Sequence, residues 1–302
     1  MLDCVIIGGG PAGLTAAIYL ARFHLSVLVV DRGDGRALSI PRSHNHAGFP
    51  DGIAGAHLIA LMTEQAIKYG AQIVHGEVAR LQPSSDGNLT CDWEDKSYTA
   101  RSVLLATGVV NRRPMIDDAL HDEGLQRGLI RYCPVCDGYE VTDQTVVVVG
   151  SEHHGVEEAI FLRSFTRHIT LICPYGAHRL SEDLRARCNS AGIEVMDGPI
   201  HRFTLLDDKI ALNLPGKQLR FDTLYPALGS DIQSQLAVSL GADVSAEGQV
   251  KVDLQQRTSI CGLYAAGDVV LGLDQISHAM GEGGVAATAI RNDLAQQGFL
   301  LR

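Results

Sequence analysis

CVIIGGGPAGLTAAIYLARFHLSVLVVD, residues 4–31, decides the fold of the first part of this chain. It reads as a short apolar strand, a glycine-rich turn, a helix and a second apolar strand that ends at Asp31. Gly8, Gly10 and Gly13 fill the glycine positions of the pattern GxGxxG, in which a helix N-terminus offers free N–H groups to a pyrophosphate. Asp31 stands where a carboxylate accepts the hydroxyls of a ribose. This stretch therefore predicts a βαβ unit that binds a dinucleotide.

The same pattern occurs a second time in the chain. Residues 146–159, VVVVGSEHHGVEEA, again read as a buried strand, a turn and the start of a helix. Gly8 corresponds to Gly150 and Gly13 to Gly155, and the offset is 142 residues in both cases. The sequence therefore predicts two dinucleotide-type folds.

The positions that would contact a ligand differ between the two copies. Glu152 stands where the first copy has Gly10. A carboxylate side chain there would block and repel a pyrophosphate. Cys173 replaces Asp31, so the ribose-binding carboxylate is also missing. We expect the second copy to keep the architecture and to have altered ligand chemistry.

Length and composition exclude several classes of protein. With 302 residues, the chain is long enough for two domains that each bury a core. A formal net charge of −10 gives no general attraction to nucleic acid or to an anionic membrane, and no apolar run approaches a membrane span. The first residues do not resemble a secretory signal. We expect a cytoplasmic protein, which also suits the cysteines that have no close neighbour, namely Cys4, Cys91, Cys173, Cys188 and Cys261.

The order of the segments predicts that one domain is inserted into the other. Strand-like sequence at residues 102–108 resumes at 258–268, and a long helix is expected from about Gly281 to Gln297. The predicted fold class is α/β, with two Rossmann-like domains of the three-layer ββα type. The first domain would comprise residues 1–112 and 229–302, and the inserted domain residues 113–228.

CPVCDG, residues 133–138, is the only Cys-x-x-Cys of the sequence. Zinc would require a second such pair or a histidine pair, so we expect no metal site. Two thiols at this spacing can cycle between dithiol and disulfide. Cys133 and Cys136 are therefore the candidate redox pair, and Asp137 is placed to transfer protons for them.

Five blocks of the chain, in this order, resemble the low-molecular-weight thioredoxin reductases: GGGPAGLTAA, HNHAGFPDGIAG, LLATG, RYCPVCDG and GLYAAGDV. The resemblance implies FAD in the split domain and an inserted NADPH domain that carries the Cys-x-x-Cys. It also implies a homodimer that passes electrons from NADPH through flavin to the disulfide and on to thioredoxin. We expect a thioredoxin-like protein or a small dithiol or disulfide as the partner. Within the pair, Cys136 would face the flavin and Cys133 would attack the disulfide of the partner.

The resemblance also assigns residues to the FAD site. The glycine turn would hold the pyrophosphate and Asp31 the adenosine ribose. The other expected contacts are to the adenine, the ribityl chain and the flavin ring, and the positive end of the last helix would point at the pyrimidine side. The cofactor-binding residues implied in this way are Gly8, Gly10, Ala12, Gly13, Asp31, Asn45, Val78, Thr107, Gly108, Asp268, Gln275 and Ile276.

Three departures from that family concern NADPH. The family's loop of small residues is replaced by GSEHHG, which contains Glu152, and the arginines that follow the next strand are replaced by CPY, Cys173–Tyr175. Asp274 stands where an arginine usually precedes the glutamine. Arginine is the residue that pairs best with phosphate. We therefore expect that NADPH is not an efficient electron donor.

Other functions remain open. Pro134 and the GYE that follows Gly138 resemble the dithiol oxidases of this fold, which pass electrons from flavin to oxygen, although that group has histidine where this chain has Asp137. A ferredoxin-dependent disulfide reductase would also tolerate the loss of an NADPH site. The alternative of another class is a flavin-binding sensor or interaction protein. Retention of both cysteines and Asp137 favours an enzyme.

Overall fold

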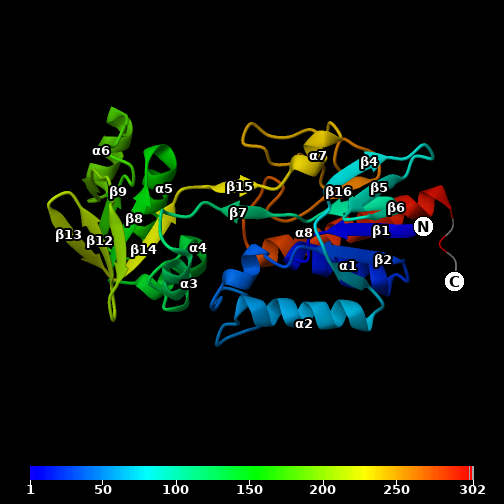
Figure 1. The fold of residues 1–302 in the computed structure, drawn as a ribbon, viewed down its shortest axis with the longest axis horizontal. Coiled ribbons are helices and arrows are strands. Elements are labelled where there is room, and N and C mark those ends of the chain that lie inside the picture. Colours follow the sequence, from blue (N-terminus) through cyan, green and yellow to red (C-terminus); the bar gives the residue numbers. More distant parts are fainter. Residues whose placement is uncertain (299, 301–302) are drawn as a thin grey trace.

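The computed structural model describes residues 1–298 and 300, and they form two lobes (Figure 1). The first lobe contains a seven-stranded sheet in the order β3-β2-β1-β6-β5-β4, with β16 paired to β6. β1 lies between β2 and β6 in parallel register, as its run of buried apolar residues predicts for a central strand. The strands are β1 (Leu2–Ile7), β2 (Val27–Asp31), β3 (Gln72–His75), β4 (Arg80–Pro83), β5 (Leu89–Trp93), β6 (Lys96–Leu105) and β16 (Leu263–Ala265).

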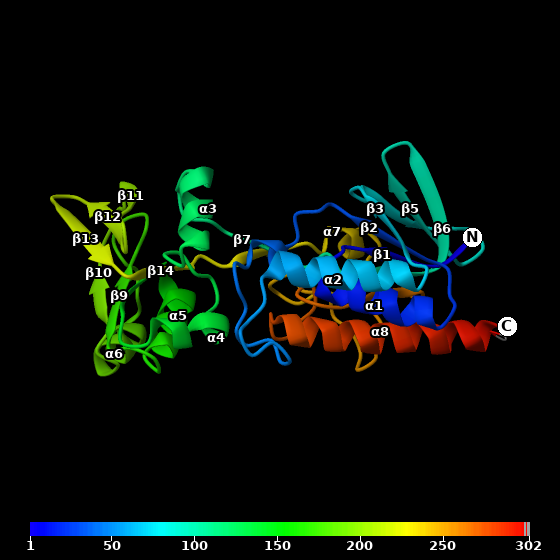
Figure 2. The ribbon, with the colours of Figure 1, turned by 90° about the horizontal axis from the view of Figure 1, so that it is seen from below.

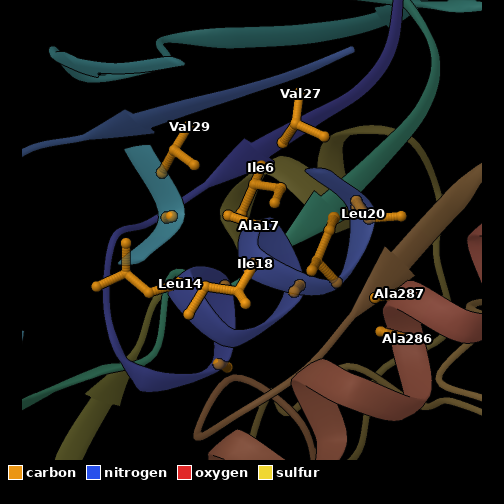
Figure 3. Close-up of a cluster of buried hydrophobic side chains, with 14 of the residues drawn as sticks. Ile6, Leu14, Ala17, Ile18, Leu20, Val27, Val29, Ala286 and Ala287 are labelled. Carbon is orange, nitrogen blue, oxygen red and sulfur yellow. The ribbon is translucent and has the colours of Figure 1, made fainter. Parts of the chain in front are cut away.

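Three helices run side by side over one face of this sheet (Figure 2): α1 (Pro11–Arg22), α2 (Gly55–Lys68) and α8 (Ile276–Gln297). Leu14 and Leu20 of α1 belong to the same buried cluster as Ile6 of the sheet and the alanines of α8 (Figure 3). The expected start of the last helix at Gly281 is wrong, because α8 begins at Ile276. Glycines near its start serve close packing: a Cβ on Gly283 would lie 2.3 Å from the carbonyl oxygen of Ala12 in α1.

The second lobe has the three predicted layers. Its parallel sheet has the order β10-β9-β8-β14, with β8 (Thr145–Gly150), β9 (His168–Ile172), β10 (Glu194–Met196) and β14 (Thr223–Ala227). Val146 and Val148 face the core beneath α5 (Glu152–Leu162), whereas Val147 and Val149 face the opposite core. That second core lies beneath an antiparallel sheet of β11 (Arg202–Leu205), β12 (Ile210–Leu214) and β13 (Lys217–Phe221). The fold class predicted from the sequence is confirmed.

A two-stranded ribbon joins the lobes (Figure 1). β7 (Val109–Asn111) leads out of the first lobe, β15 (Ser230–Ile232) leads back into it, and the two pair in antiparallel register. The second lobe is thus inserted between β6 and β16 of the first. The remaining elements are η1 (Arg36–Ser39), α3 (Asp118–Gln126), α4 (Pro134–Asp137), η2 (Tyr139–Val141), α6 (Glu182–Ser190) and α7 (Gln235–Ser239). Within the described residues, no helix combines the length and the apolar character needed to cross a membrane.

Candidate functional site

Of the three glycines that fill the GxGxxG pattern of the first turn, two are close-packed and one is open. A Cβ on Gly8 would lie 2.3 Å from the Ala106 carbonyl oxygen, and a Cβ on Gly13 would lie 2.0 Å from the Gly8 carbonyl oxygen. A Cβ on Gly10, the N-cap of α1, would meet no protein atom within 4 Å. The space in front of Gly10 is therefore free to admit a ligand against the backbone.

A cavity of about 940 Å³ extends from this turn to the second lobe. Its size lies near the upper end of the roughly 300–1,000 Å³ that is common for ligand pockets. Gly13 is not part of its wall, because it packs beneath the turn against Gly8. The other residues expected to bind the cofactor all line the cavity: Gly8, Gly10, Ala12, Asp31, Asn45, Val78, Thr107, Gly108, Asp268, Gln275 and Ile276.

The candidate redox pair lies at the other end of this cavity. Cys133 and Cys136 form a disulfide at the N-terminal end of α4, and both line the cavity wall. Gln275, the N-cap of α8 in the first lobe, points its amide nitrogen at both sulfurs, at 3.2 Å from Cys133 Sγ and 3.3 Å from Cys136 Sγ. Asn45 Nδ2 donates to Gln275 Oε1 at 2.9 Å. The disulfide of the second lobe therefore faces the first lobe.

Asp137 follows the disulfide and is held by two donors. The Tyr225 hydroxyl donates to Oδ1 at 2.8 Å, and Arg131 Nη1 donates to Oδ2 at 3.2 Å. Burial raises the pKa of Asp137 above its usual value, and the charge of Arg131 and the Tyr225 hydrogen bond oppose that shift. The carboxyl group predicted to move protons is thus oriented by two side chains that the sequence did not reveal.

A second buried carboxyl group lies near Asp137. Glu158 projects from α5 and lines the cavity, and its Oε1 is buried without a hydrogen-bond partner among the described residues. Burial and the negative charge of Asp137 raise the pKa of Glu158 to about 8. His154, one turn earlier on α5, places Nε2 at 3.9 Å from Glu158 Oε2.

Arg36 connects the acidic residues near the start of α8. Its guanidinium contacts Asp268 at 2.6 Å and Asp274 at 3.3 Å. Burial raises the pKa of Asp268, and the charge of Arg36 opposes this shift. Asp274, which stands where the resemblance leads us to expect an arginine, is therefore paired with a positive side chain, and its effect on NADPH binding stays a prediction.

The second glycine turn keeps its packing and differs where a ligand would lie. A Cβ on Gly150 would lie 2.7 Å from the Ala227 carbonyl oxygen, and one on Gly155 would lie 3.0 Å from the Gly150 carbonyl carbon. Glu152 is exposed and has φ +55°, whereas Gly10 at the equivalent position has φ −78°. Cys173 is buried, which leaves a thiol in the core where the first copy presents Asp31.

Four side chains of the site were missed in the sequence: Arg36, Arg131, Glu158 and Tyr225. They lie far from their partners in the chain or, like Arg131, within a block that was interpreted for its cysteines alone. Glu158 carried a signal that could have been used, since a glutamate among the apolar residues VEEAIF on the buried side of a helix is unusual. In the part of the chain described, no group of three or more His, Cys, Asp or Glu could hold a metal.

A disulfide in the wall of a nucleotide-sized cavity, beside a buried acid, defines the class of disulfide oxidoreductases, and comparison with known proteins gives the family. The family model for pyridine nucleotide-disulphide oxidoreductase matches residues 2–283, so the chain belongs to that family. A thioredoxin reductase of Mycolicibacterium smegmatis is 33% identical over 89% of this chain and 88% of its own length.

Solved structures give the same result. The thioredoxin reductase of Streptococcus pyogenes MGAS5005 is 30% identical with a TM-score of 0.90, covering 98% of this chain and 99% of its own. The thioredoxin reductase of Lactococcus lactis in its FR conformation is 28% identical and covers 98% of this chain and 100% of its own, but the TM-score is 0.64. Coverage is the same for this chain while the score falls, as expected where two similar lobes are placed differently relative to each other.

The family implies FAD, and the first lobe fits that cofactor. The space before Gly10 admits a pyrophosphate, and Asp31 closes the end of β2, where its Oδ1 accepts from the Gly9 N–H at 2.8 Å. The second lobe differs from the first at the corresponding positions. A side chain with a carboxylate occupies position 152, and no guanidinium stands at residues 173–175.

Proposed function

We propose that this protein is an FAD-dependent dithiol–disulfide oxidoreductase in which Cys133 and Cys136 are the redox pair. The observation that carries the proposal is the placement of their disulfide in the wall of the cavity, with Gln275 of the first lobe at hydrogen-bond distance from both sulfurs. The domain of residues 1–112 and 229–302 holds FAD, and residues 113–228 form the inserted domain.

The eleven expected residues that line the cavity, among them Gln275 and Ile276 at the start of α8, would hold the cofactor. The turn around Gly10 accepts the pyrophosphate and Asp31 the ribose, because the backbone is open at the first and a carboxylate ends β2 at the second. Asp268 would hold the ribityl chain, and Gln275 and Ile276 at the N-terminus of α8 would line the flavin ring, since all three line the cavity. Bound there, FAD supplies two-electron chemistry to the disulfide.

Residues of this chain control the reactivity of the two thiols. The backbone N–H of Cys136 donates to Cys133 Sγ at 3.1 Å, and Gln275 donates to the same sulfur. Donors of this kind stabilise a thiolate, so Cys133 is the nucleophile that attacks an external disulfide. Asp137 gives a proton to the departing thiolate and takes it back from a thiol, as a general acid and base.

The substrate is a thioredoxin-like protein or a small disulfide. Val135 lies between the two cysteines and is 46% exposed, and Tyr139 beyond them is 81% exposed. These apolar side chains offer contact surface beside the pair. A homodimer, as the resemblance implies, is part of this proposal.

NADPH is not the efficient electron donor in this proposal. Glu152 places a carboxylate at the pyrophosphate position, and like charges about 4 Å apart repel by roughly 4 kcal/mol at a surface-like dielectric. Tyr175 is exposed at a position where a guanidinium would be needed for a phosphate. The reductant, or the oxidant if the enzyme runs toward disulfide formation, is then another molecule.

Anaerobic titration of the FAD-loaded protein tests the proposal. We expect that micromolar NADPH fails to bleach the flavin within milliseconds, whereas dithionite bleaches it and reduces Cys133–Cys136 to thiols. Rapid bleaching by NADPH would refute the donor argument. Peroxide release in air from a supplied dithiol would identify the oxidase direction, and reduction by reduced ferredoxin would identify the reductase direction.

The Cys136→Ser variant separates an enzyme from a flavin-binding sensor. An enzyme loses all turnover with dithiols or disulfides, because the second sulfur is needed to re-form the intrachain bond. A sensor or interaction protein keeps its partner binding without this sulfur. Persistence of dithiol turnover in the variant would exclude the proposed redox pair.

A further inference from the structure

The redox pair has a second carboxyl group behind it. α5 packs against both α4, which carries Asp137, and β14, which carries Tyr225. The groups that interact with Glu158 are Asp137 from α4, Tyr225 from β14 and His154 from α5 itself. Glu140 from η2 and Arg131 from the segment before α4 line the same cavity. Glu158 therefore lies within a cluster of groups that opens into the cavity.

The two carboxyl groups are anchored very differently. Asp137 accepts from Tyr225 and Arg131, so its ionised form is compensated. Glu158 is 12% exposed, and its buried Oε1 accepts no hydrogen bond from the described residues. A buried carboxylate without donors is costly, whereas the neutral acid is tolerated. In agreement, its pKa is raised to about 8, so the acid is protonated at neutral pH.

A route to solvent exists on the same helix. His154 is 63% exposed and reaches within 3.9 Å of Glu158 Oε2. Burial and the charge of His153 lower its pKa, so the neutral imidazole predominates and can both accept and donate a proton. The adjacent residues form an outer pair, His153 and Glu157, whose side chains lie 3.5 Å apart, and Glu157 also pairs with Arg187.

We propose that Glu158 is the proton reservoir for the redox pair: it reloads Asp137 after each proton transfer to a departing thiolate and is itself refilled from solvent through His154. The inference rests on the proposed dithiol–disulfide function. The proposal assigns His154, which lines the cavity, a role in proton transfer.

The proton balance of disulfide reduction leaves one proton to be supplied from outside the pair. In the reduced pair, the Cys133 thiolate attacks R–S–S–R, a Cys133–S–S–R bond forms, and RS⁻ leaves. Cys136 then loses its proton, attacks Cys133 Sγ and releases a second RS⁻ as the intrachain disulfide re-forms. Two RS⁻ become two RSH, but the pair itself held one proton. The second proton comes from the carboxyl groups, and Glu158 supplies it.

The choice of external disulfide separates a reaction that needs this second proton from one that does not. The FAD-loaded protein, reduced anaerobically with one equivalent of dithiothreitol, is mixed with either 5,5′-dithiobis(2-nitrobenzoate) or bis(2-hydroxyethyl) disulfide. The aromatic thiolate is a good leaving group that needs no proton, whereas the alkyl thiolate must be protonated. We expect Glu158→Gln to slow the alkyl reaction by about tenfold or more and to leave the aromatic one within about twofold. Glu157→Gln is the control and should leave both rates near wild type.

The pH profile gives a second kinetic readout. The wild-type rate with the alkyl disulfide should fall as pH rises through about 8, where Glu158 loses its proton. That descending limb should be absent from the Glu158→Gln profile. His154→Gln should slow the alkyl reaction in weakly buffered solution and recover in imidazole buffer, while His153→Gln should behave as wild type.

Infrared difference spectroscopy detects the protonation state of Glu158 without turnover. The wild type at pH 7 should show the carbonyl band of a protonated carboxylic acid, and the band should vanish above pH of about 8. Glu158→Gln should lack it, and Glu157→Gln should retain it.

The outcomes are decisive in either direction. If Glu158→Gln matches Glu157→Gln in the ratio of alkyl to aromatic rates, or if the carbonyl band survives in it, Glu158 is no reservoir even though the aromatic reaction shows a working redox pair. If Glu158→Gln does not fold, the His154→Gln and His153→Gln pair decides, and equal alkyl rates in that pair overturn the inference. If the wild type fails to react with the aromatic disulfide, the proposed function and this inference fall together.

Discussion

The side-chain amide of Gln275 lies 3.2 Å from Cys133 Sγ, although the two residues are 142 positions apart and belong to different lobes. Asn45 fixes the orientation of that amide by donating to its oxygen, so that the NH₂ group is directed at the sulfurs. When the disulfide is reduced, the same NH₂ group is positioned to donate to a thiolate.

We predict that Gln275→Leu raises the pKa of the reactive thiol by about one unit, since a hydrogen bond to a charged group contributes roughly 1.5–3 kcal/mol. The rate of alkylation of the reduced protein by iodoacetamide, measured against pH, gives this pKa. Gln235→Leu is the control, because Gln235 lines the same cavity and its side-chain amide donates to the Ile232 carbonyl oxygen. If the midpoint of the pH dependence is the same in Gln275→Leu and in wild type, the Gln275 amide does not lower the pKa of the thiol.

Two alanine substitutions in the first glycine turn should have opposite consequences. Gly10→Ala adds a methyl group that meets no protein atom within 4 Å, at a φ of −78° that alanine accepts. The protein without cofactor should keep its thermal stability, but its FAD affinity should fall by about tenfold or more because the methyl group occupies the pyrophosphate position. Gly13→Ala collides with backbone at 2.0 Å and should destabilise the lobe. Equal FAD affinity of Gly10→Ala and wild type would locate the cofactor elsewhere.

Position 152 should respond to charge and to size separately. Glu152→Gln removes the charge and keeps the side chain, whereas Glu152→Gly also removes the Cβ and relieves a φ of +55° that costs about 1–2 kcal/mol in other residues. We expect NADPH affinity, measured by calorimetry, to rise with the first substitution and further with the second. Thermal stability should rise only with glycine. If neither substitution changes NADPH affinity, the loss lies at residues 173–175 instead.

Glu158 should make the protein less stable as pH rises. Its pKa is about 8 in the folded protein and 4.5 as the ordinary value, so between these limits the folded state holds a proton that the unfolded state has released. Its contribution to stability is fully present below pH 4.5 and is lost as pH rises through about 8, at up to about 1.4 kcal/mol per unit. Urea unfolding of Glu158→Gln should therefore show a flatter pH dependence than wild type. Equal slopes in the two proteins would contradict the buried acid.

Local patterns in the sequence were sufficient for the fold. The runs 4–7 and 146–149 became central strands, and the constant offset between Gly8 and Gly150 anticipated two lobes of the same design. The start of α8 was placed at Gly281 instead of Ile276, because Gln275 at the N-cap is not a residue that commonly caps a helix and makes no side-chain cap hydrogen bond. Gly283 lies inside the helix and permits its contact with α1, a role that depends on tertiary packing and leaves no local signal.

Site residues were predictable from the sequence where a single motif indicates both the residue and its function, as with Cys133, Cys136 and Asp137. They were not predictable where the role arises from a meeting of distant segments. Tyr225 reaches Asp137 from 88 positions away, and Arg36 reaches Asp274 from 238 positions away. Pairing of this kind depends on the register of strands and the placement of lobes, which a single sequence does not display.

In the second glycine turn, the residues that pack against the fold are different from the residue that would contact a ligand. Gly150 and Gly155 face the sheet, where added methyl groups collide with backbone, while position 152 faces solvent. Substitutions at position 152 can therefore change what this lobe recognises at a cost limited to the local backbone strain of about 1–2 kcal/mol. Architecture and specificity are inherited here on separate residues, so specificity is free to evolve faster.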